Sequence, residues 1–301
     1  MNSIEKALQK KHIEAAAKKS TTENSLTPKV QPVDERSTIE KPQVSQVKPA
    51  KSDGIVSNEK VLIDFDMLER KGFVSTNIQR RLINEEYRVI KRKLLNNAFG
   101  PLSHSLKNSN IIMVTSSRPG EGKTFTAINL ALSIALEQDK TVLLVDADVL
   151  RPNIMKTLEL ENKQGLMEYL LGEKENIAEV MCRTSLSNLR IITAGKSHHL
   201  STELLASQRM FDAVEEFANR YTDRVVIVDT PPLLGITETA ILANLAGQAI
   251  VVTEENKTKL IDIENAVSQL NTNMAIGFVV NKSDKDTSDS ASYGYYYAGA
   301  N

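Results

Sequence analysis

A short loop between an apolar stretch and a helix-forming stretch has the residue types needed to bind phosphate. Residues 111–114 are apolar and mostly branched; Gly120 and Gly122 follow, and Lys123 and Thr124 open a segment with apolar residues at helical spacing. The glycines let backbone N–H groups turn toward an anion, and a helix N-terminus adds its dipole. Lys123 can reach the β- and γ-phosphates of a nucleotide, and the Thr124 hydroxyl can bind Mg²⁺.

This spacing matches the phosphate-binding pattern Gly-x-x-x-x-Gly-Lys-Ser/Thr, except that Ser117 replaces the first glycine. A glycine-rich turn that binds no nucleotide is the alternative. The expected strand and helix around an intact Gly-Lys-Thr favour nucleotide binding. The residues expected to contact the nucleotide are Ser117, Arg118, Pro119, Gly120, Glu121, Gly122, Lys123, Thr124 and Phe125.

Two further apolar stretches end in carboxylates. Residues 141–145 lead to Asp146 and Asp148, which leave an extended chain on the same side, and residues 225–228 lead to Asp229. An aspartate after a strand can also cap a helix or form a turn. Two such strands downstream of a phosphate loop favour metal and phosphate chemistry, because three carboxylates can hold Mg²⁺ and leave one as a base.

The C-terminal part of the chain carries two more polar features. Asn281 opens an Asn-Lys-Ser-Asp stretch that is similar to a guanine-reading motif, but its amide could equally read adenine, so the base stays open. Four of the seven tyrosines lie in the last nine residues: Tyr293, Tyr295, Tyr296 and Tyr297. They can be exposed phenols that accept phosphoryl groups, with an adhesive aromatic tail or a β-edge peptide as the alternative.

Alternating apolar patterns predict a mostly parallel β-sheet with helices on both faces, the α/β architecture of a P-loop NTPase. The strands are expected at 111–115, 141–145, 189–193, 225–228, 249–253 and 275–280. The helices are expected at 77–97, 123–138, 165–171, 175–183, 202–221, 237–246 and 258–272. Ligands of such sheets bind beyond the carboxyl ends of the strands, where these carboxylates fall.

Composition divides the chain into four parts. Residues 1–19 are rich in helix formers and predict a short N-terminal helix, and residues 20–57 combine prolines with polar residues and predict a disordered linker. Residues 58–283 form the expected P-loop domain. Residues 284–301 are rich in Ser, Asp and Gly, which predicts a flexible tail.

Charge and cysteine content limit the kinds of partner and the cellular compartment that the sequence favours. A net charge of −1 gives no indication of nucleic-acid binding. One cysteine, Cys182, predicts a reducing compartment and a buried thiol in the helix expected at 175–183. His198 and His199 lack metal-ligand spacing and are expected on the surface. No apolar run approaches the roughly 18 residues of a membrane span, which predicts a cytoplasmic protein that reaches the membrane through a partner.

From about residue 60 to its end, the chain resembles the bacterial tyrosine kinases (BY-kinases), the P-loop kinases of capsule and exopolysaccharide systems. The resemblance is to the stand-alone cytoplasmic type, in particular autokinases linked to exosortase-type polysaccharide loci. The matching segments are 116–124 as Walker A, 143–148 as Walker A′, 226–232 as Walker B, 165–172, 201–207 and the tyrosine cluster. The combination of Walker A′ with C-terminal tyrosines is specific to this family.

A charged helix motif and three departures accompany this resemblance. The residues Glu85, Arg88 and Lys91 are similar to the family's Glu-x-x-Arg-x-x-Arg motif, which builds a ring of subunits. Lys91 replaces its last arginine and loses the planar fork. Leu150 holds the arginine position of Walker A′, and Arg151 follows it. Arg118 falls where ParA- and MinD-like ATPases carry a signature lysine, a role that we do not transfer to it.

The resemblance implies phosphoryl transfer from ATP, with Mg²⁺, to the tail tyrosines. Lys123 would hold the phosphates, while Thr124, Asp148 and Asp229 would organise Mg²⁺, directly or through water. Asp146 would act as the base or orienter for the tyrosine hydroxyl. A tail too short to fold back to its own site would be phosphorylated by a neighbouring subunit.

The implied partners are other copies in a homo-oligomeric ring, a separate membrane-embedded polysaccharide co-polymerase that activates the kinase, and a tyrosine phosphatase. Up to four phosphate groups on adjacent tails would repel the subunits and open the ring. Two alternatives stay open: a ParA- or MinD-like switch ATPase, and a non-catalytic ATP-binding scaffold of a polysaccharide polymerase. Leu150 is the one feature that supports the scaffold.

Overall fold

The computed structural model describes residues 60–75 and 81–283. The expected N-terminal helix at 1–19, the linker at 20–57 and the tail at 284–301 with its four tyrosines lie outside the described residues. The expected domain at 58–283 falls within the compact unit that Asp53–Asn301 form.

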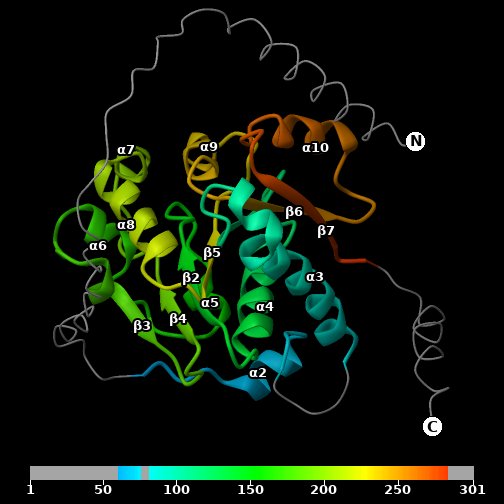
Figure 1. Cartoon of the computed structure of the whole chain (residues 1–301), viewed down its shortest axis with the longest axis horizontal. Helices are drawn as coiled ribbons and strands as arrows, with labels where there is room; N and C mark the ends of the chain where they lie inside the picture. Colours follow the sequence, from blue (N-terminus) through cyan, green and yellow to red (C-terminus); the bar gives the residue numbers. More distant parts are fainter. Residues whose placement is uncertain (1–59, 76–80, 284–301) are drawn as a thin grey trace, which may run out of the picture. The chain divides into compact units, whose positions relative to one another are not determined.

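The described strands form one seven-stranded sheet in the order β3-β4-β2-β5-β1-β6-β7 (Figure 1). Every neighbouring pair is parallel except β3 and β4, which are antiparallel. The strands are β1 (Ile111–Ser116), β2 (Thr141–Asp146), β3 (Met181–Arg183), β4 (Leu189–Ile192), β5 (Arg224–Asp229), β6 (Gln248–Glu254) and β7 (Ala275–Asn281). Because β1, β2 and β5 are neighbours, the residues after their carboxyl ends meet at one edge of the sheet.

Helices cover both faces of this sheet. Side chains alternate along each strand: Ile112 and Val114 of β1 join a core cluster with α2 to α5, whereas Ile111 and Met113 join clusters with α6 to α10. The helices are α2 (Phe65–Arg70), α3 (Leu82–Phe99), α4 (Lys123–Ala135), α5 (Ile154–Thr157), α6 (Leu166–Leu170), α7 (Ser201–Leu205), α8 (Gln208–Asn219), α9 (Thr237–Ala243) and α10 (Leu260–Val267). The α/β fold with a mostly parallel sheet is therefore confirmed.

The prediction of a helix at 175–183 was wrong. A short 3₁₀ helix, η2 (Ile177–Val180), is followed by the edge strand β3. The Asn176 side chain accepts a hydrogen bond from the Ala178 N–H and caps η2, and the chain then pairs with β4. Pairing with β4, the next strand along the chain, overrides local helix propensity here. Cys182 therefore lies half-buried on a strand, where burial raises the pKa of its thiol.

The helix predicted at 202–221 is two helices, α7 and α8. The backbone of Ser207 is extended between them, and its hydroxyl donates a hydrogen bond to the Leu204 carbonyl oxygen at 2.6 Å. Serine competes for backbone hydrogen bonds in this way and favours helix boundaries. The helix expected at 258–272 is also shorter in the structure, where α10 spans Leu260–Val267.

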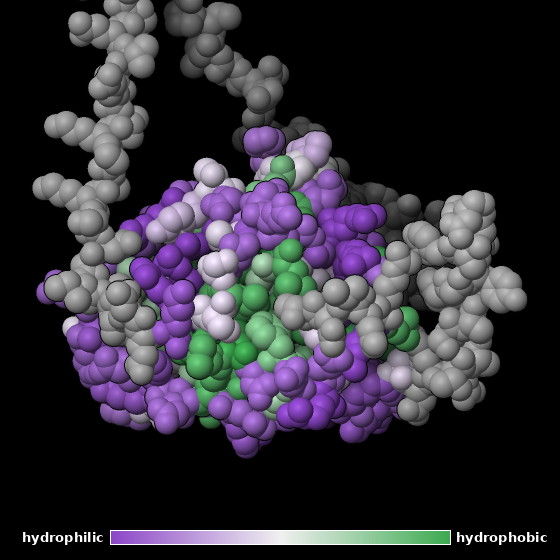
Figure 2. All heavy atoms as spheres, turned by 90° about the horizontal axis from the view of Figure 1, so that it is seen from below, coloured by the Kyte–Doolittle hydropathy of each residue, from purple (hydrophilic) through white to green (hydrophobic). Residues whose placement is uncertain are grey.

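Several apolar side chains remain on the surface. Figure 2 shows one face of the molecule, with apolar residues gathered near its centre and hydrophilic residues around them. Leu62 is the most exposed large apolar side chain among the described residues. Within residues 60–75 and 81–283, no helix has both the length and the apolar character needed to span a membrane.

Candidate active site

The phosphate loop connects β1 to α4 and has the backbone conformation that its glycines allow. Gly120 and Gly122 have φ angles of 87° and 101°, in the left-handed region. A Cβ atom on Gly122 would lie 1.9 Å from the side-chain nitrogen of Asn281. Lys123 is the first residue of α4, so the N–H groups of the first helical turn lie next to the loop. The loop therefore has room and donors for an anion.

Lys123 lies among the carboxylates that the sequence placed near it. Its Nζ atom is 2.6 Å from Asp148 Oδ2 and 3.8 Å from Asp229 Oδ1. Burial opposes the charge of Lys123, but Asp229 and Asp148 outweigh it and raise the pKa of the amine. The ammonium group thus stays charged, and a bound phosphate would compete with the aspartates for it.

Thr124 and Asp229 meet beneath the loop. The Thr124 hydroxyl donates a hydrogen bond to Asp229 Oδ2 at 2.7 Å. The other oxygen, Oδ1, is buried and accepts no hydrogen bond from the described residues. Burial raises the pKa of Asp229 to about 6, although Lys123 opposes this shift. An unpartnered buried carboxylate oxygen is costly, which favours a further donor or cation here.

Asp146 has a different environment from Asp148 and Asp229. Its Oδ2 atom accepts hydrogen bonds from the Asn153 and Ile154 N–H groups, both at 3.1 Å, and its buried Oδ1 atom has no partner among the described residues. Asp146 lies directly opposite Asp229 in the pairing of β2 with β5. Burial, and then the charge of Asp229, raise the pKa of Asp146 to about 7. A carboxylate with this pKa can exchange a proton near neutral pH.

The residues present fit a magnesium nucleotide. The loop supplies N–H groups and an ammonium group for phosphates, and Thr124, Asp148 and Asp229 supply hard oxygen ligands. No group of three or more His, Cys, Asp or Glu in the described part of the chain is arranged to hold a metal by itself. Mg²⁺ in phosphate-transfer sites commonly takes phosphate and water oxygens to complete its shell, so this finding fits the class of site.

Residues far along the chain hold the outer side of the phosphate loop, in an arrangement that we call the P-loop clamp. Asn281 Nδ2 donates to the Glu121 carbonyl oxygen at 2.9 Å, and Lys282 Nζ donates to the Gly120 carbonyl oxygen at 2.8 Å. The Glu121 carboxylate accepts hydrogen bonds from the Arg118 N–H and the Thr258 hydroxyl.

The Arg118 guanidinium completes the clamp by binding Asp262 on α10 at 2.8 and 3.0 Å. This bond raises the pKa of Arg118 and lowers that of Asp262. Sequence reasoning missed Thr258, Asp262 and Lys282 as neighbours of the loop. Only Lys282 carried a signal, because it follows Asn281 in the Asn-Lys-Ser-Asp stretch.

Some expected nucleotide contacts lie elsewhere or have other neighbours. The Phe125 ring packs against Phe73 with 4.6 Å between ring centroids, at the margin of the core. Pro119 is exposed, and the Ser117 hydroxyl is buried without a hydrogen-bond partner among the described residues. At the irregular end of Walker A′, Arg151 donates its backbone N–H to Asp148 Oδ1 at 3.1 Å.

The three residues of the expected ring motif differ in exposure. On α3, Glu85 and Arg88 form an exposed ion pair at 2.7 Å. Lys91 is buried: its Nζ atom donates to the Ser133 carbonyl oxygen at 2.8 Å and pairs with Glu137 at 2.5 Å. The Lys91 ammonium group therefore joins α3 to α4 and its following turn within one protomer.

Comparisons with known proteins identify the family of this chain. The family model described as "AAA domain" (AAA_31) matches residues 109–276. The chain is 32% identical over 229 residues to the tyrosine-protein kinase YwqD of Bacillus subtilis, a match that covers 75% of this chain and 92% of that protein. It is 32% identical over 190 residues to the tyrosine-protein kinase Wzc of Salmonella typhimurium, covering 62% of this chain but only 26% of Wzc.

Solved structures show the same relationship. The kinase domain of the Escherichia coli tyrosine kinase ETK is 25% identical, with a TM-score of 0.58, and the match covers 75% of this chain and 92% of that domain. The match to YwqD extends over nearly the whole of that protein. The chain belongs to the bacterial tyrosine-protein kinases, a family of P-loop NTPase fold.

Proposed function

We propose that this chain is an ATP-dependent protein-tyrosine autokinase that phosphorylates Tyr293, Tyr295, Tyr296 and Tyr297 in trans within an oligomer and so regulates exopolysaccharide or capsule synthesis or export. The observation that carries the proposal is the group formed by Lys123, Asp146, Asp148 and Asp229 beside a phosphate loop. The named activity of the relatives supports the reaction class.

The chain's own groups account for binding and positioning. The loop N–H groups and Lys123 bind the β- and γ-phosphates of ATP, which frees Asp148 from its ion pair with Lys123. Asp148, Asp229 and the Thr124 hydroxyl would hold Mg²⁺, which would neutralise charge on the phosphates. Positioning and charge stabilisation supply most of the rate in such sites. Asn281 keeps one amide oxygen for the base while its nitrogen holds the loop.

Asp146 is the candidate base or orienter. Its raised pKa suits acceptance of a proton from a tyrosine hydroxyl, and two backbone N–H groups fix the orientation of its carboxylate. Binding of a metal ion nearby would favour the ionised form of the group. Asp146 would therefore be ready to accept a proton once the magnesium nucleotide is in place.

The partners follow the same reasoning. We propose that Glu85 and Arg88, exposed on α3, take part in a ring interface, to which Lys91 contributes by fixing α3 against α4. A separate membrane-embedded polysaccharide co-polymerase would activate the kinase and bring it to the inner face of the cell membrane. A tyrosine phosphatase would remove the phosphates. No nucleic-acid partner is proposed.

Radiolabel transfer tests this function. The full chain with γ-labelled ATP, Mg²⁺ and its activator should label the C-terminal peptide, as read by mass spectrometry. Lys123→Met and a chain cut after Ser292 should show no label there. ATP hydrolysis without label, unchanged by the truncation, would instead identify a switch ATPase. ATP binding without hydrolysis or label would identify a scaffold.

Transfer in trans needs its own test, because Lys282, near the start of the tail, lies on the chain's own phosphate loop. An extended span of 11 residues from Lys282 to Tyr293 reaches up to about 40 Å, which does not exclude the same copy. Lys123→Met has a tail but lacks the phosphate-binding lysine, and the truncated chain has the lysine but no acceptor. A mixture of the two should label the Lys123→Met tail, and an unlabelled mixture would refute transfer in trans.

A further inference from the structure

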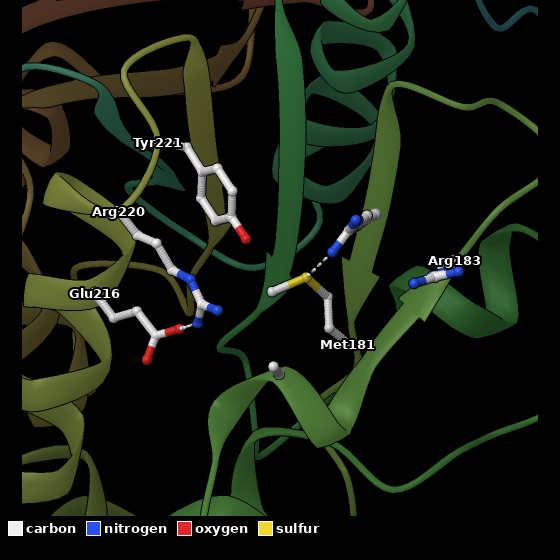
Figure 3. Close-up of a pocket in the computed structure, with 7 residues that line it drawn as sticks. Met181, Arg183, Glu216, Arg220 and Tyr221 are labelled. Atoms are coloured by element: carbon white, nitrogen blue, oxygen red, sulfur yellow. Dashed lines mark hydrogen bonds and ion pairs between the residues drawn. The ribbon is translucent and has the colours of Figure 1, made fainter. Parts of the chain in front are cut away.

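A second polar pocket lies away from the phosphate loop. Its lining includes Met181, Arg183, Arg190, Glu216, Arg220 and Tyr221, from β3, β4 and the end of α8 (Figure 3). Arg190 is near the amino end of β4, and Tyr221 precedes β5, whereas the aspartates of the active site lie at the carboxyl ends of β2 and β5. The pocket therefore lies toward the amino ends of the parallel strands β4 and β5, whereas the active site lies at the carboxyl ends of β2 and β5.

The charges of this arginine pocket do not balance. Three guanidinium groups line it against one carboxylate, Glu216, which already pairs with Arg220. Arg183 and Arg190 are directly opposite each other in the antiparallel pairing of β3 with β4. Like charges in this position destabilise a sheet. Two positive charges are thus left over, on residues that the pairing of β3 with β4 places opposite each other.

No carboxylate within the described part of the chain lies within ion-pair distance of Arg183 or Arg190. Among residues 60–75 and 81–283, the Arg190 side chain makes one hydrogen-bond contact, with the Met181 sulfur at 3.4 Å. Arg224, which is buried, adds charge behind the pocket and stacks 3.7 Å from the centre of the Tyr221 ring. Burial and the charge of Arg190 lower the pKa of Arg224, whereas Tyr221 and the Asp223 carboxylate oppose this shift. Within the described part of the chain, Arg183 and Arg190 are therefore left without a carboxylate counter-ion.

We infer that this arginine pocket binds the phosphate group of a phosphotyrosine in the tail of a second copy of this chain, which rests on the proposed function as the source of that residue. A phosphate monoester carries about −1.5 to −2 charges at neutral pH, which matches the two surplus positive charges. Guanidinium groups bind phosphate through paired hydrogen bonds. Figure 3 shows the Tyr221 ring and the Met181 sulfur facing the same space, where they offer contacts to an aromatic ring.

The reach of the tail favours a second copy for its first tyrosine. β7 and β3 are the two outer strands of the sheet, six strand spacings apart, which is about 29 Å. Lys282 follows the carboxyl end of β7, whereas the pocket lies toward the opposite ends of the strands. A path around the surface is longer than a straight line, and an extended span from Lys282 to Tyr293 reaches at most about 40 Å. The span from Lys282 to Tyr293 is therefore barely long enough for Tyr293 to reach the pocket of its own copy.

Binding of a synthetic peptide tests the inference without using the kinase reaction. A fluorescent peptide of residues 288–301 with phosphate on Tyr293 is titrated with the full-length Lys123→Met chain and followed by anisotropy. We expect it to bind at least tenfold more tightly than the unphosphorylated peptide. Arg190→Gln and Arg183→Gln should each weaken binding at least tenfold, and the control Arg70→Gln, in an exposed arginine of α2, should not.

Three results would overturn the inference: equal binding of the two peptides, binding that survives Arg190→Gln and Arg183→Gln, or a phosphopeptide no tighter than inorganic phosphate as a competitor. The last would identify a site for free phosphate. Because the peptide is made chemically, these results stand apart from any failure of the labelling experiment. Thermal unfolding controls for damage: both Gln variants should keep or raise the wild-type melting temperature, since each removes one of two opposed like charges.

Discussion

Replacing Asp146 by Asn should stabilise the nucleotide-free protein at alkaline pH and remove its activity. The Asp146 carboxylate is 1% exposed, and its pKa is raised from 3.8 to about 7. Between about pH 4 and pH 7 the folded protein keeps a proton on Asp146 that the unfolded chain has released. The free energy of unfolding therefore falls as pH rises through this window.

The size of the effect follows from the shift. Each pKa unit corresponds to about 1.4 kcal/mol, so a shift of about three units costs the folded state on the order of 4 kcal/mol above pH 8. Asparagine has the same shape and can still accept hydrogen bonds from the Asn153 and Ile154 N–H groups. We expect Asp146→Asn to gain on the order of 2–4 kcal/mol over wild type at pH 8 and only about 1–2 kcal/mol at pH 5, where about one pH unit of the window has been crossed.

Urea unfolding from pH 5 to pH 8, without nucleotide, measures this difference. The midpoint should fall with pH in wild type and be flatter in Asp146→Asn, with an unchanged slope against urea. Asp139→Asn, at an exposed carboxylate just before β2, is the control and should behave as wild type. Tyrosine phosphorylation by Asp146→Asn should drop by about 10²–10⁴-fold. A variant that is less stable than wild type at pH 8, or equally dependent on pH, would refute the reasoning.

Gly122→Ala should abolish ATP binding in a fluorescent-nucleotide assay and lower the free energy of unfolding by about 1–3 kcal/mol. The reason is that the φ angle of Gly122 is 101° and the added Cβ atom would meet the Asn281 amide. Retained ATP binding would contradict this. Asn129→Ala should lower the unfolding free energy by about 1–3 kcal/mol in urea, because it removes the acceptor, 2.6 Å away, of the buried Val74 N–H; Gln208→Ala, on an exposed helix face, is the control. Lys282→Met should weaken ATP binding by about threefold to tenfold in calorimetry with little change in melting temperature, because it frees the Gly120 carbonyl from one charge-assisted bond; unaltered affinity would remove Lys282 from the clamp.

Features encoded locally could be predicted from the sequence. The loop around Lys123 and the strands that lead to Asp146 and Asp229 depend on neighbouring residues and on periodicity, and the structure has them where they were expected. The bond of Arg118 to Asp262 joins residues that are 144 positions apart in the chain. No local pattern contains such a pairing, so it could be found only after the chain was folded.

The burial of Lys91 has the same origin. A lysine in a charged helix motif is expected at the surface, but the packing of α3 on α4 places its ammonium group on the Ser133 carbonyl oxygen. Motif spacing predicted that three residues would lie along one helix; it did not predict that the third would point into the protomer. Substitution of Lys91 therefore acts first on the stability of the protomer, because its contacts lie within one copy.

The P-loop clamp makes the phosphate loop and the start of the tail one mechanical unit. Asn281 and Lys282 hold two carbonyl groups of the loop, and the acceptor segment begins two residues later, at residue 284. When another molecule holds the tail, tension along the chain acts first on these two hydrogen bonds. By thermodynamic reciprocity, a nucleotide that tightens or loosens the loop must change the affinity of the tail for its binding partner by the same factor. Binding of nucleotide to the loop and binding of the tail to its partner are then thermodynamically coupled.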